Sequence, residues 1–303
     1  MTGATGLVGG ALVARLLERG TAVRAVSRSA RAAADERVER VVWDGVEVPA
    51  DALAGCDAVV HLAGEPIFGG LPTQGRLERM RASRVDSTRA IARTLGELGA
   101  SERPRTLVNA SAVGFYGSRG DERLGEASAP GRGLLAELCR DWEAAADEAR
   151  AHAVRVARMR LGIVFAREGG ALATMRRPFA WNVGGRLGNG RQWVPWVHLD
   201  DAVGALLLAL EGRLEGAVNV VAPEPVTNRE LTAALAERLA ASPLLARLQS
   251  DLVRVPGFAI RAVFGEIADE LLGSKRVVPG ALERARYRYR FASLGDALDD
   301  CLA

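Results

Sequence analysis

Three glycines near the start of the chain have the spacing of a turn that binds phosphate. Gly3, Gly6 and Gly9 are followed by apolar residues at helical spacing as far as Gly20. In such turns the first glycine permits a tight bend, the second lets the backbone approach a pyrophosphate, and the third lets helix and strand pack closely. Free N–H groups at the helix N-terminus then bind the anion. We therefore predict a dinucleotide-binding turn formed by Gly3, Thr5, Gly6, Leu7, Val8 and Gly9.

The residues after this helix favour a cofactor that carries a 2′-phosphate. Residues 21–27 form an apolar-rich run of strand length, so the turn, helix and strand make most of a βαβ unit. A cofactor without the 2′-phosphate calls for Asp or Glu about 20 residues past the glycines. The chain has Ser27 and Arg28 there, and a guanidinium can bind phosphate in bidentate fashion. We expect NADP rather than NAD; the alternative is a solvated arginine.

Composition excludes several classes of protein. The 303 residues can bury a substantial core, and no run reaches the roughly 18 apolar residues of a membrane span. The three cysteines are scattered without the spacing of metal ligands, which favours free thiols in a reducing compartment. A net charge of +3, with acidic and basic residues interleaved, argues against a nucleic-acid partner. We expect a cytoplasmic protein, monomeric or homodimeric, with a small-molecule substrate, no metal and no membrane partner.

Strand-like and helical runs alternate through the first half of the chain. Buried strands are expected at 38–43, 58–62, 106–110 and 154–161, with helices at 74–98 and 134–150. This alternation predicts an α/β fold, a Rossmann-like doubly wound parallel sheet. The pattern changes after about residue 165, and residues 256–303 look mainly helical.

The predicted domains follow from this change of pattern. We expect a dinucleotide-binding domain over residues 1–165, to which residues 192–222 return. A smaller, mainly helical substrate lobe would cover residues 166–303 and include a C-terminal helical domain from about residue 250.

The first strand of the sheet is apparently missing, since only Met1 precedes Thr2. Five or so buried apolar side chains would contribute roughly 1.5–3 kcal/mol each. Their sum is comparable to the ~5–15 kcal/mol net stability of a domain. We therefore expect the natural product to start a few residues upstream with an apolar run.

Several segments, in their order and spacing, resemble the extended short-chain dehydrogenase/reductases. More narrowly, they resemble the atypical subgroup of epimerase-family, sugar-nucleotide-epimerase-like proteins that end in a small domain of unknown function. The resemblance covers nearly the whole chain and does not specify a substrate. It is carried by residues 2–10, 44–45, 61–67, 109–117, 138–143, 160–164 and 196–201, with 264–279 similar to the C-terminal domain.

The resemblance implies a role for each strand end. Arg28 would bind the adenosine phosphate, Asp44 would sit beside the adenine, and the segment Leu62, Ala63, Gly64 would run under the cofactor. A parallel sheet predicts this placement independently, because ligands bind outside the carboxyl ends of the strands. Asp44 could equally be an ordinary turn residue, and His61 is better explained as a hydrogen-bonded strand-end residue than as a catalyst.

One departure from the superfamily concerns catalysis. Active members carry Tyr-x-x-x-Lys on the helix after the fifth strand, with a serine nearby, and the tyrosine transfers the proton. Here Leu135 and Cys139 fall about where that pair is expected. Ser111 matches the superfamily serine, and Tyr116 is an alternative proton donor or an aromatic wall of the pocket. Ser111 and Tyr116 are therefore the predicted catalytic residues.

Three residues are candidates for substrate binding. Glu65 follows the fourth strand and would act as a general base or order its loop. Arg191 lies in a loop similar to the one that reaches the substrate in sugar-nucleotide enzymes, although it could simply be solvated. Trp196 belongs to a motif that the resemblance places in the support of the substrate lobe.

Two functions compete. The first is an NADP(H)-dependent, epimerase-like oxidoreductase acting on an unknown small hydroxyl or carbonyl substrate, with hydride chemistry supplied by the cofactor. The second is a non-catalytic NADP(H)-binding sensor or scaffold protein. The missing Tyr/Lys pair favours the second, whereas Ser111 and a full substrate lobe favour the first.

Overall fold

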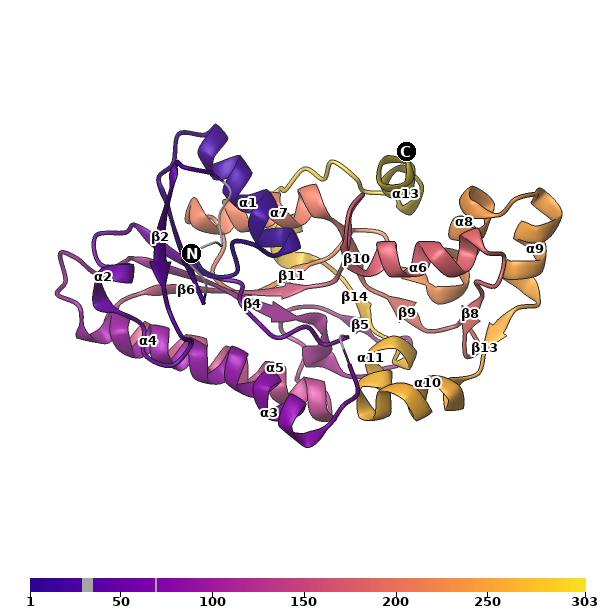
Figure 1. Ribbon diagram of the computed structural model, residues 1–303, viewed down its shortest axis with the longest axis horizontal. Coiled ribbons are helices and arrows are strands. Elements are labelled where there is room, and N and C mark those ends of the chain that lie inside the picture. Colours follow the sequence, from indigo (N-terminus) through magenta and orange to yellow (C-terminus); the bar gives the residue numbers. More distant parts are fainter. Residues whose placement is uncertain (29–34, 69) are drawn as a thin grey trace. The chain divides into compact units, whose positions relative to one another are not determined.

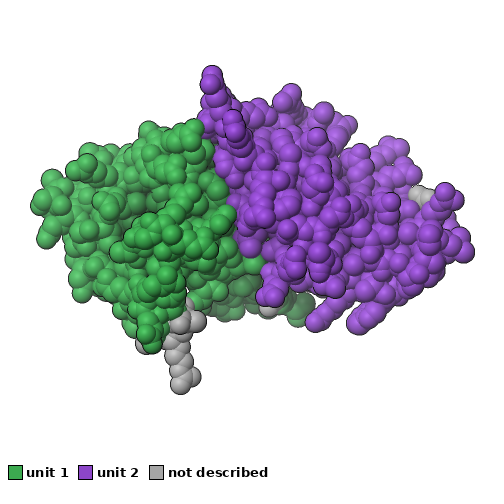
Figure 2. Space-filling view, turned by 90° about the horizontal axis from the view of Figure 1, so that it is seen from above, with its two compact units in different colours: residues 1–112, 138–160, 203–218 green, residues 113–137, 161–202, 219–303 purple. Residues whose placement is uncertain are grey.

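The computed structural model describes residues 1–28, 35–68 and 70–303, which form two compact units (Figure 2). Unit 1 comprises residues 1–112, 138–160 and 203–218, and unit 2 comprises residues 113–137, 161–202 and 219–303. These boundaries differ from the division expected at residue 165. Residues 113–137 belong to unit 2, where β5 (Arg123–Leu124) pairs in parallel with β14 (Arg276–Val277).

A parallel sheet forms the centre of unit 1. Its strands follow the order β2-β1-Thr2-β3-β4-β6-β11, in which the single residue Thr2 bridges β1 and β3 in parallel. The strand bounds are β1 (Val23–Ser27), β2 (Val38–Val42), β3 (Ala58–His61), β4 (Thr106–Ala112), β6 (Arg155–Leu161) and β11 (Gly216–Val220). Apolar-rich runs predicted β1, β2, β3, β4 and β6, as is typical of parallel strands, whereas β11 was not predicted.

Backbone hydrogen bonds hold Thr2 at this central position. Its N–H donates to Val60 O (2.9 Å), its carbonyl accepts from Leu62 N (3.4 Å), and Val26 N donates to Met1 O (2.7 Å). Within the described residues, a one-residue bridge therefore occupies the position where the sequence predicts a strand.

Helices cover both faces of this sheet (Figure 1). On one face lie α1 (Leu7–Glu18) and α7 (Leu199–Leu210), and on the other lie α4 (Ser87–Glu97) and α5 (Leu134–Asp147). Apolar side chains of α1 pack on β1 and β2, and those of α4 pack on β3, β4 and β6. The predicted doubly wound α/β fold is confirmed.

The long helix predicted over residues 74–98 has an irregular middle. It consists of α3 (Gln74–Arg81), a π-helical segment (Ala82–Asp86) and α4. Two shorter helices complete unit 1, α2 (Ala50–Leu53) and the 3₁₀-helix Glu148–His152.

Unit 2 combines short strand pairs with helices around its own core, in which Phe165, Trp196 and Leu298 are fully buried. Its other strand pairs are β7 (Ile163–Phe165) with β10 (Trp196–His198), β8 (Arg186–Leu187) with β13 (Arg254–Val255), and β9 (Trp193–Val194) with β12 (Val226–Thr227). Its helices are α6 (Gly170–Ala180), α8 (Asn228–Leu239), α9 (Pro243–Asp251), α10 (Gly257–Phe264), α11 (Ala268–Leu272), α12 (Gly280–Arg284) and α13 (Leu294–Leu302), with 3₁₀-helices at Val113–Tyr116 and Gly265–Ile267.

Among the described residues, no helix combines the length and the apolar character needed to cross a bilayer.

Candidate functional site

The glycine turn of unit 1 has the geometry that a phosphate-binding turn requires. Gly3 has φ +70°, and a Cβ there would lie 2.7 Å from Leu62 C. A Cβ on Gly9 would lie 2.0 Å from Gly3 O, so helix and turn approach too closely for any side chain. Gly6 is open by contrast, since apart from its chain neighbours a Cβ would meet only Gly3 O, at 3.3 Å. No side chain caps α1, which leaves the N–H groups of its first turn for an anion.

The carboxyl ends of the strands bring the other predicted cofactor residues to the same edge of the sheet. Ser27 ends β1, and the exposed Arg28 follows it directly. Asp44 is exposed beyond β2, and its Oδ1 accepts a hydrogen bond from Val46 N (2.8 Å), which makes it a turn residue as well. Leu62, Ala63 and Gly64 follow β3, and Ala63 N donates to Thr2 Oγ1 (3.3 Å).

His61 is held in the interior at the end of β3. Its Nδ1 lies 2.6 Å from Thr2 Oγ1, and its Nε2 lies 3.1 Å from Ser87 Oγ. Burial lowers the pKa of His61 to about 3, and the positive charges of the N-terminal amino group and Arg84 act in the same direction. The ring is therefore neutral at physiological pH, and its contacts are those of a hydrogen-bonded strand-end residue.

This burial makes the stability of the protein depend on pH. The pKa of His61 is about 3 in the folded protein and about 6.5 when unfolded. Below pH 6.5 the unfolded chain binds a proton that the folded protein excludes. We expect the free energy of unfolding to fall on this account by up to about 1.4 kcal/mol per pH unit. Urea unfolding at pH 5 to 8 measures the slope, and His61→Gln should flatten it between pH 6.5 and 5. An unchanged slope in this variant would contradict the assignment.

Ser111 belongs to a buried charged network in unit 1. Its Oγ donates a hydrogen bond to Glu143 Oε1 (2.7 Å), from α5. Arg160 of β6 binds the same carboxylate in bidentate fashion, through Nε to Oε1 (2.8 Å) and Nη2 to Oε2 (2.9 Å). The side chains of Glu143 and Arg160 are only 3–4% exposed. Sequence reasoning missed this pair, because α5 and β6 each carry several charged residues and no spacing distinguishes these two.

Tyr116 is fully buried in unit 2. Its hydroxyl lies 2.6 Å from Asn219 Oδ1 and 3.1 Å from Gly125 O, both acceptors. The structure therefore uses this hydroxyl to join segments of unit 2, and its predicted catalytic role stays a prediction.

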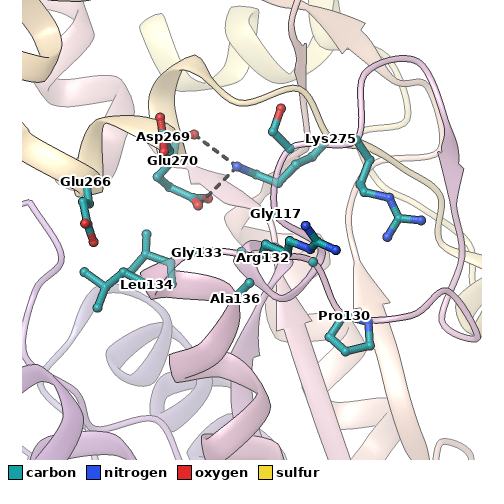
Figure 3. A pocket seen from close by; sticks show the side chains of 15 residues that line it. Gly117, Pro130, Arg132, Gly133, Leu134, Ala136, Glu266, Asp269, Glu270 and Lys275 are labelled. Carbon is teal, nitrogen blue, oxygen red and sulfur yellow. Dashed lines mark hydrogen bonds and ion pairs between the residues drawn. The ribbon is translucent and has the colours of Figure 1, made fainter.

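A cavity of about 530 Å³ opens in unit 2 (Figure 3). Its lining comes from residues 114–136 and 266–275, which are far apart in the sequence. Lys275, the only lysine of the chain, is 2% exposed, and its Nζ lies 3.2 Å from Glu270 Oε2 and 3.3 Å from Glu270 O. Polar and apolar side chains share the wall, as is usual for small-molecule pockets.

Comparison with known proteins agrees with this architecture. The family model of the NAD dependent epimerase/dehydratase family matches residues 1–221, and that of a domain of unknown function, DUF1731, matches residues 255–301. The chain belongs to this epimerase/dehydratase family. An epimerase family protein of Mycobacterium leprae is 37% identical over 98% of this chain and 93% of its own length.

Two solved structures of epimerases are similar over 99% of this chain. The human epimerase family protein SDR39U1 (isoform 2), crystallised with NADPH, is 30% identical, with a TM-score of 0.82 and 97% of that chain covered. A nucleoside-diphosphate sugar epimerase from Corynebacterium glutamicum is 34% identical with a TM-score of 0.78. The chain spans just over half of that protein, 57% of its length.

The epimerase family chain has no Tyr-x-x-x-Lys pair, and Leu135 and Cys139 are the residues expected at about its position. Leu135 lines the cavity of unit 2. Cys139 is buried in unit 1. Neither side chain supplies the phenol hydroxyl or the ammonium group of the missing pair.

The predicted substrate residues lie in different environments. Glu65 is half-buried in unit 1, and its N–H donates to Ser83 Oγ (2.9 Å). Arg191 is exposed in unit 2, in a turn where its N–H donates to Asn189 Oδ1 (2.9 Å). Trp196 is 1% exposed and stacks on Phe165, so it is a core residue in this structure. None of the three lines the cavity, and their roles in substrate binding stay predictions.

His198, Asp300 and Cys301 place possible metal ligands within 4.8 Å of one another in unit 2. However, His198 Nδ1 accepts a hydrogen bond from Asp200 N (3.1 Å), so the neutral ring carries its proton on Nε2. Nε2 lies 3.4 Å from Asp300 Oδ2. We assign no metal site to this group.

Proposed function

We propose that the chain is an NADP(H)-binding oxidoreductase of the epimerase family that acts on a small hydroxyl or carbonyl substrate. The observation that carries the proposal is the glycine turn, whose Gly6 is open while Gly3 and Gly9 are closely packed. Gly6 and the first turn of α1 would hold the pyrophosphate, and Arg28 would hold the 2′-phosphate. The cofactor, when bound, supplies hydride transfer. The NADPH in the structure of human SDR39U1 supports the choice of cofactor.

Ser111 would contact the substrate as an acceptor. Its single hydroxyl proton is donated to Glu143, which leaves only oxygen lone pairs for a further partner. We infer that Ser111 binds a substrate hydroxyl better than a carbonyl.

The sensor or scaffold remains the second candidate, because the hydroxyls of Ser111 and Tyr116 are both engaged by protein groups. Single-turnover absorbance with NADPH and a panel of small carbonyl compounds separates the two functions. Oxidation of NADPH with any compound of the panel supports the enzyme. Tight NADPH binding without oxidation across the panel supports the sensor.

Arg28→Ala tests the choice of cofactor. Loss of a charge-assisted hydrogen bond to the 2′-phosphate should weaken NADPH binding by about tenfold and leave NADH binding unchanged. Fluorescence titration of both nucleotides measures the two dissociation constants. Arg93→Ala is the matched control, since Arg93 is an exposed arginine of α4 whose ion pair with Glu97 is 4.0 Å long. Equal affinities of the wild-type protein for NADH and NADPH would overturn the proposed preference.

A further inference from the structure

A buried arginine lies in the irregular middle of the helix that spans residues 74–97. Arg84 is 8% exposed and belongs to the π-helical segment Ala82–Asp86. Segments of this kind are rare, and they occur frequently at functional sites. A regular helical periodicity predicts an apolar residue at this buried position, so the sequence pattern gives no structural reason for a charge.

The guanidinium of Arg84 is fixed between two neighbours. Its Cζ lies 5.3 Å from the centroid of the Trp142 ring, within range of a cation–π interaction. On another side is Gly64, where a Cβ would lie 3.1 Å from Cζ and 3.3 Å from Nη2. Glycine at position 64 therefore leaves room for the guanidinium.

The hydrogen-bonding capacity of Arg84 is mostly unused. A guanidinium has five N–H donors, but the described residues give Arg84 a single hydrogen bond, from Nη1 to Met80 O at 3.3 Å. No carboxylate in the described part of the chain forms an ion pair with it. Arg160, which is equally buried, is by contrast bound in bidentate fashion by Glu143. A buried charge with so few partners is costly, and burial lowers the pKa of Arg84.

The position of Arg84 indicates which groups accept hydrogen bonds from its remaining donors. Gly64 follows β3, and the preceding Leu62 and Ala63 pack directly against Gly3 of the phosphate-binding turn. The guanidinium is thus at the cofactor edge of the sheet of unit 1. We propose that Arg84 binds the nicotinamide half of the dinucleotide, donating hydrogen bonds to its ribose and adjacent phosphate oxygens. This inference rests on the proposed NADP(H) binding.

Arg84→Met tests it, because methionine keeps an apolar stem and removes the donors. The probes are NADPH and adenosine 2′,5′-bisphosphate, which lacks the nicotinamide half. We expect NADPH to bind about 10 to 100 times more weakly and the bisphosphate to bind as in the wild type. Arg84→Lys, which keeps the charge without the planar fork, should recover part of the NADPH affinity. Unchanged NADPH binding in Arg84→Met would overturn the assignment, and so would an equal loss for both probes.

Controls separate this inference from the proposed function. Arg93→Met removes an exposed arginine of α4 and should leave both affinities unchanged. Failure of the wild-type protein to bind NADPH would contradict the proposed function and this assignment together. If the wild type binds NADPH and both Arg84→Met and Arg84→Lys bind it equally well, only the role of Arg84 is contradicted, and the proposed function stands. If Arg84→Met does not fold, Arg84→Lys provides the test, with a severalfold loss of NADPH affinity and none for the bisphosphate.

Discussion

Alanine at position 9 is expected to abolish tight dinucleotide binding, whereas alanine at position 10 is expected to be harmless. A Cβ on residue 9 would lie 2.0 Å from Gly3 O and 2.8 Å from Gly3 C, and these are backbone atoms that cannot rotate away as a side chain would. Helix α1 must therefore shift away from the turn, at a cost of about 1–3 kcal/mol in stability. The shift also misplaces backbone N–H groups that would meet the phosphates, each worth about 1.5–3 kcal/mol. NADPH affinity should fall by about a hundredfold or more.

Gly10 is a matched control in the same helix. A Cβ there would lie 3.6 Å from Ala4 O, an ordinary contact. Replacement of glycine by alanine inside a helix stabilises it by roughly 0.5–1 kcal/mol, so Gly10→Ala should be as stable as the wild type or slightly more stable. Urea unfolding and NADPH fluorescence titration measure both effects. Wild-type affinity in Gly9→Ala would disprove the assignment of the turn.

Removal of the Glu143 carboxylate should destabilise the protein by about 3–5 kcal/mol, because the buried guanidinium of Arg160 then loses the carboxylate that binds it in bidentate fashion. Glu143→Ala should have the largest effect. Glu143→Gln keeps a hydrogen-bond acceptor without the charge and should have a smaller one. Ser111→Ala should cost only about 1 kcal/mol, since the bidentate ion pair remains.

The control for this series is Glu148→Ala. Glu148 forms an exposed ion pair with Arg89 at 3.2 Å, and such pairs contribute about 0–1 kcal/mol. Urea unfolding of the four variants at one pH gives the ranking. Equal losses in Glu143→Ala and Glu148→Ala would show that the buried network does not stabilise the fold.

The sequence predicted the central strands because they are buried on both faces, whereas β2 was expected to be buried as well and is mostly exposed. Residues 38–43 and 106–110 were expected as strands, and the structure has them at 38–42 and 106–112. The turn was predictable for a similar reason, since its glycines are required by local backbone geometry. The π-helical segment at 82–86 was not, because a helical periodicity does not reveal one extra residue in a turn.

The partners of the predicted residues could not be derived from local pattern. Ser111 was singled out, but its partner Glu143 lies on helix α5, and Arg160, which binds Glu143, lies on a different strand. The cavity around Lys275 joins segments separated by about 130 residues or more, which no spacing rule connects. The placement of residues 113–137 in unit 2 could not be predicted for the same reason, because the pairing of β5 with β14 is a long-range contact.

The burial of Lys275 also has a consequence for the covalent chemistry of the surface. It is the only lysine, so arginine supplies 39 of the 40 Lys and Arg residues. Because the side chain of Lys275 is only 2% exposed, the folded chain offers acylating dyes and amine crosslinkers almost no side-chain target. Guanidinium groups do not react with such reagents at neutral pH, since they stay protonated. Any reagent that labels a lysine side chain of the folded protein must therefore react at Lys275, beside the cavity of unit 2.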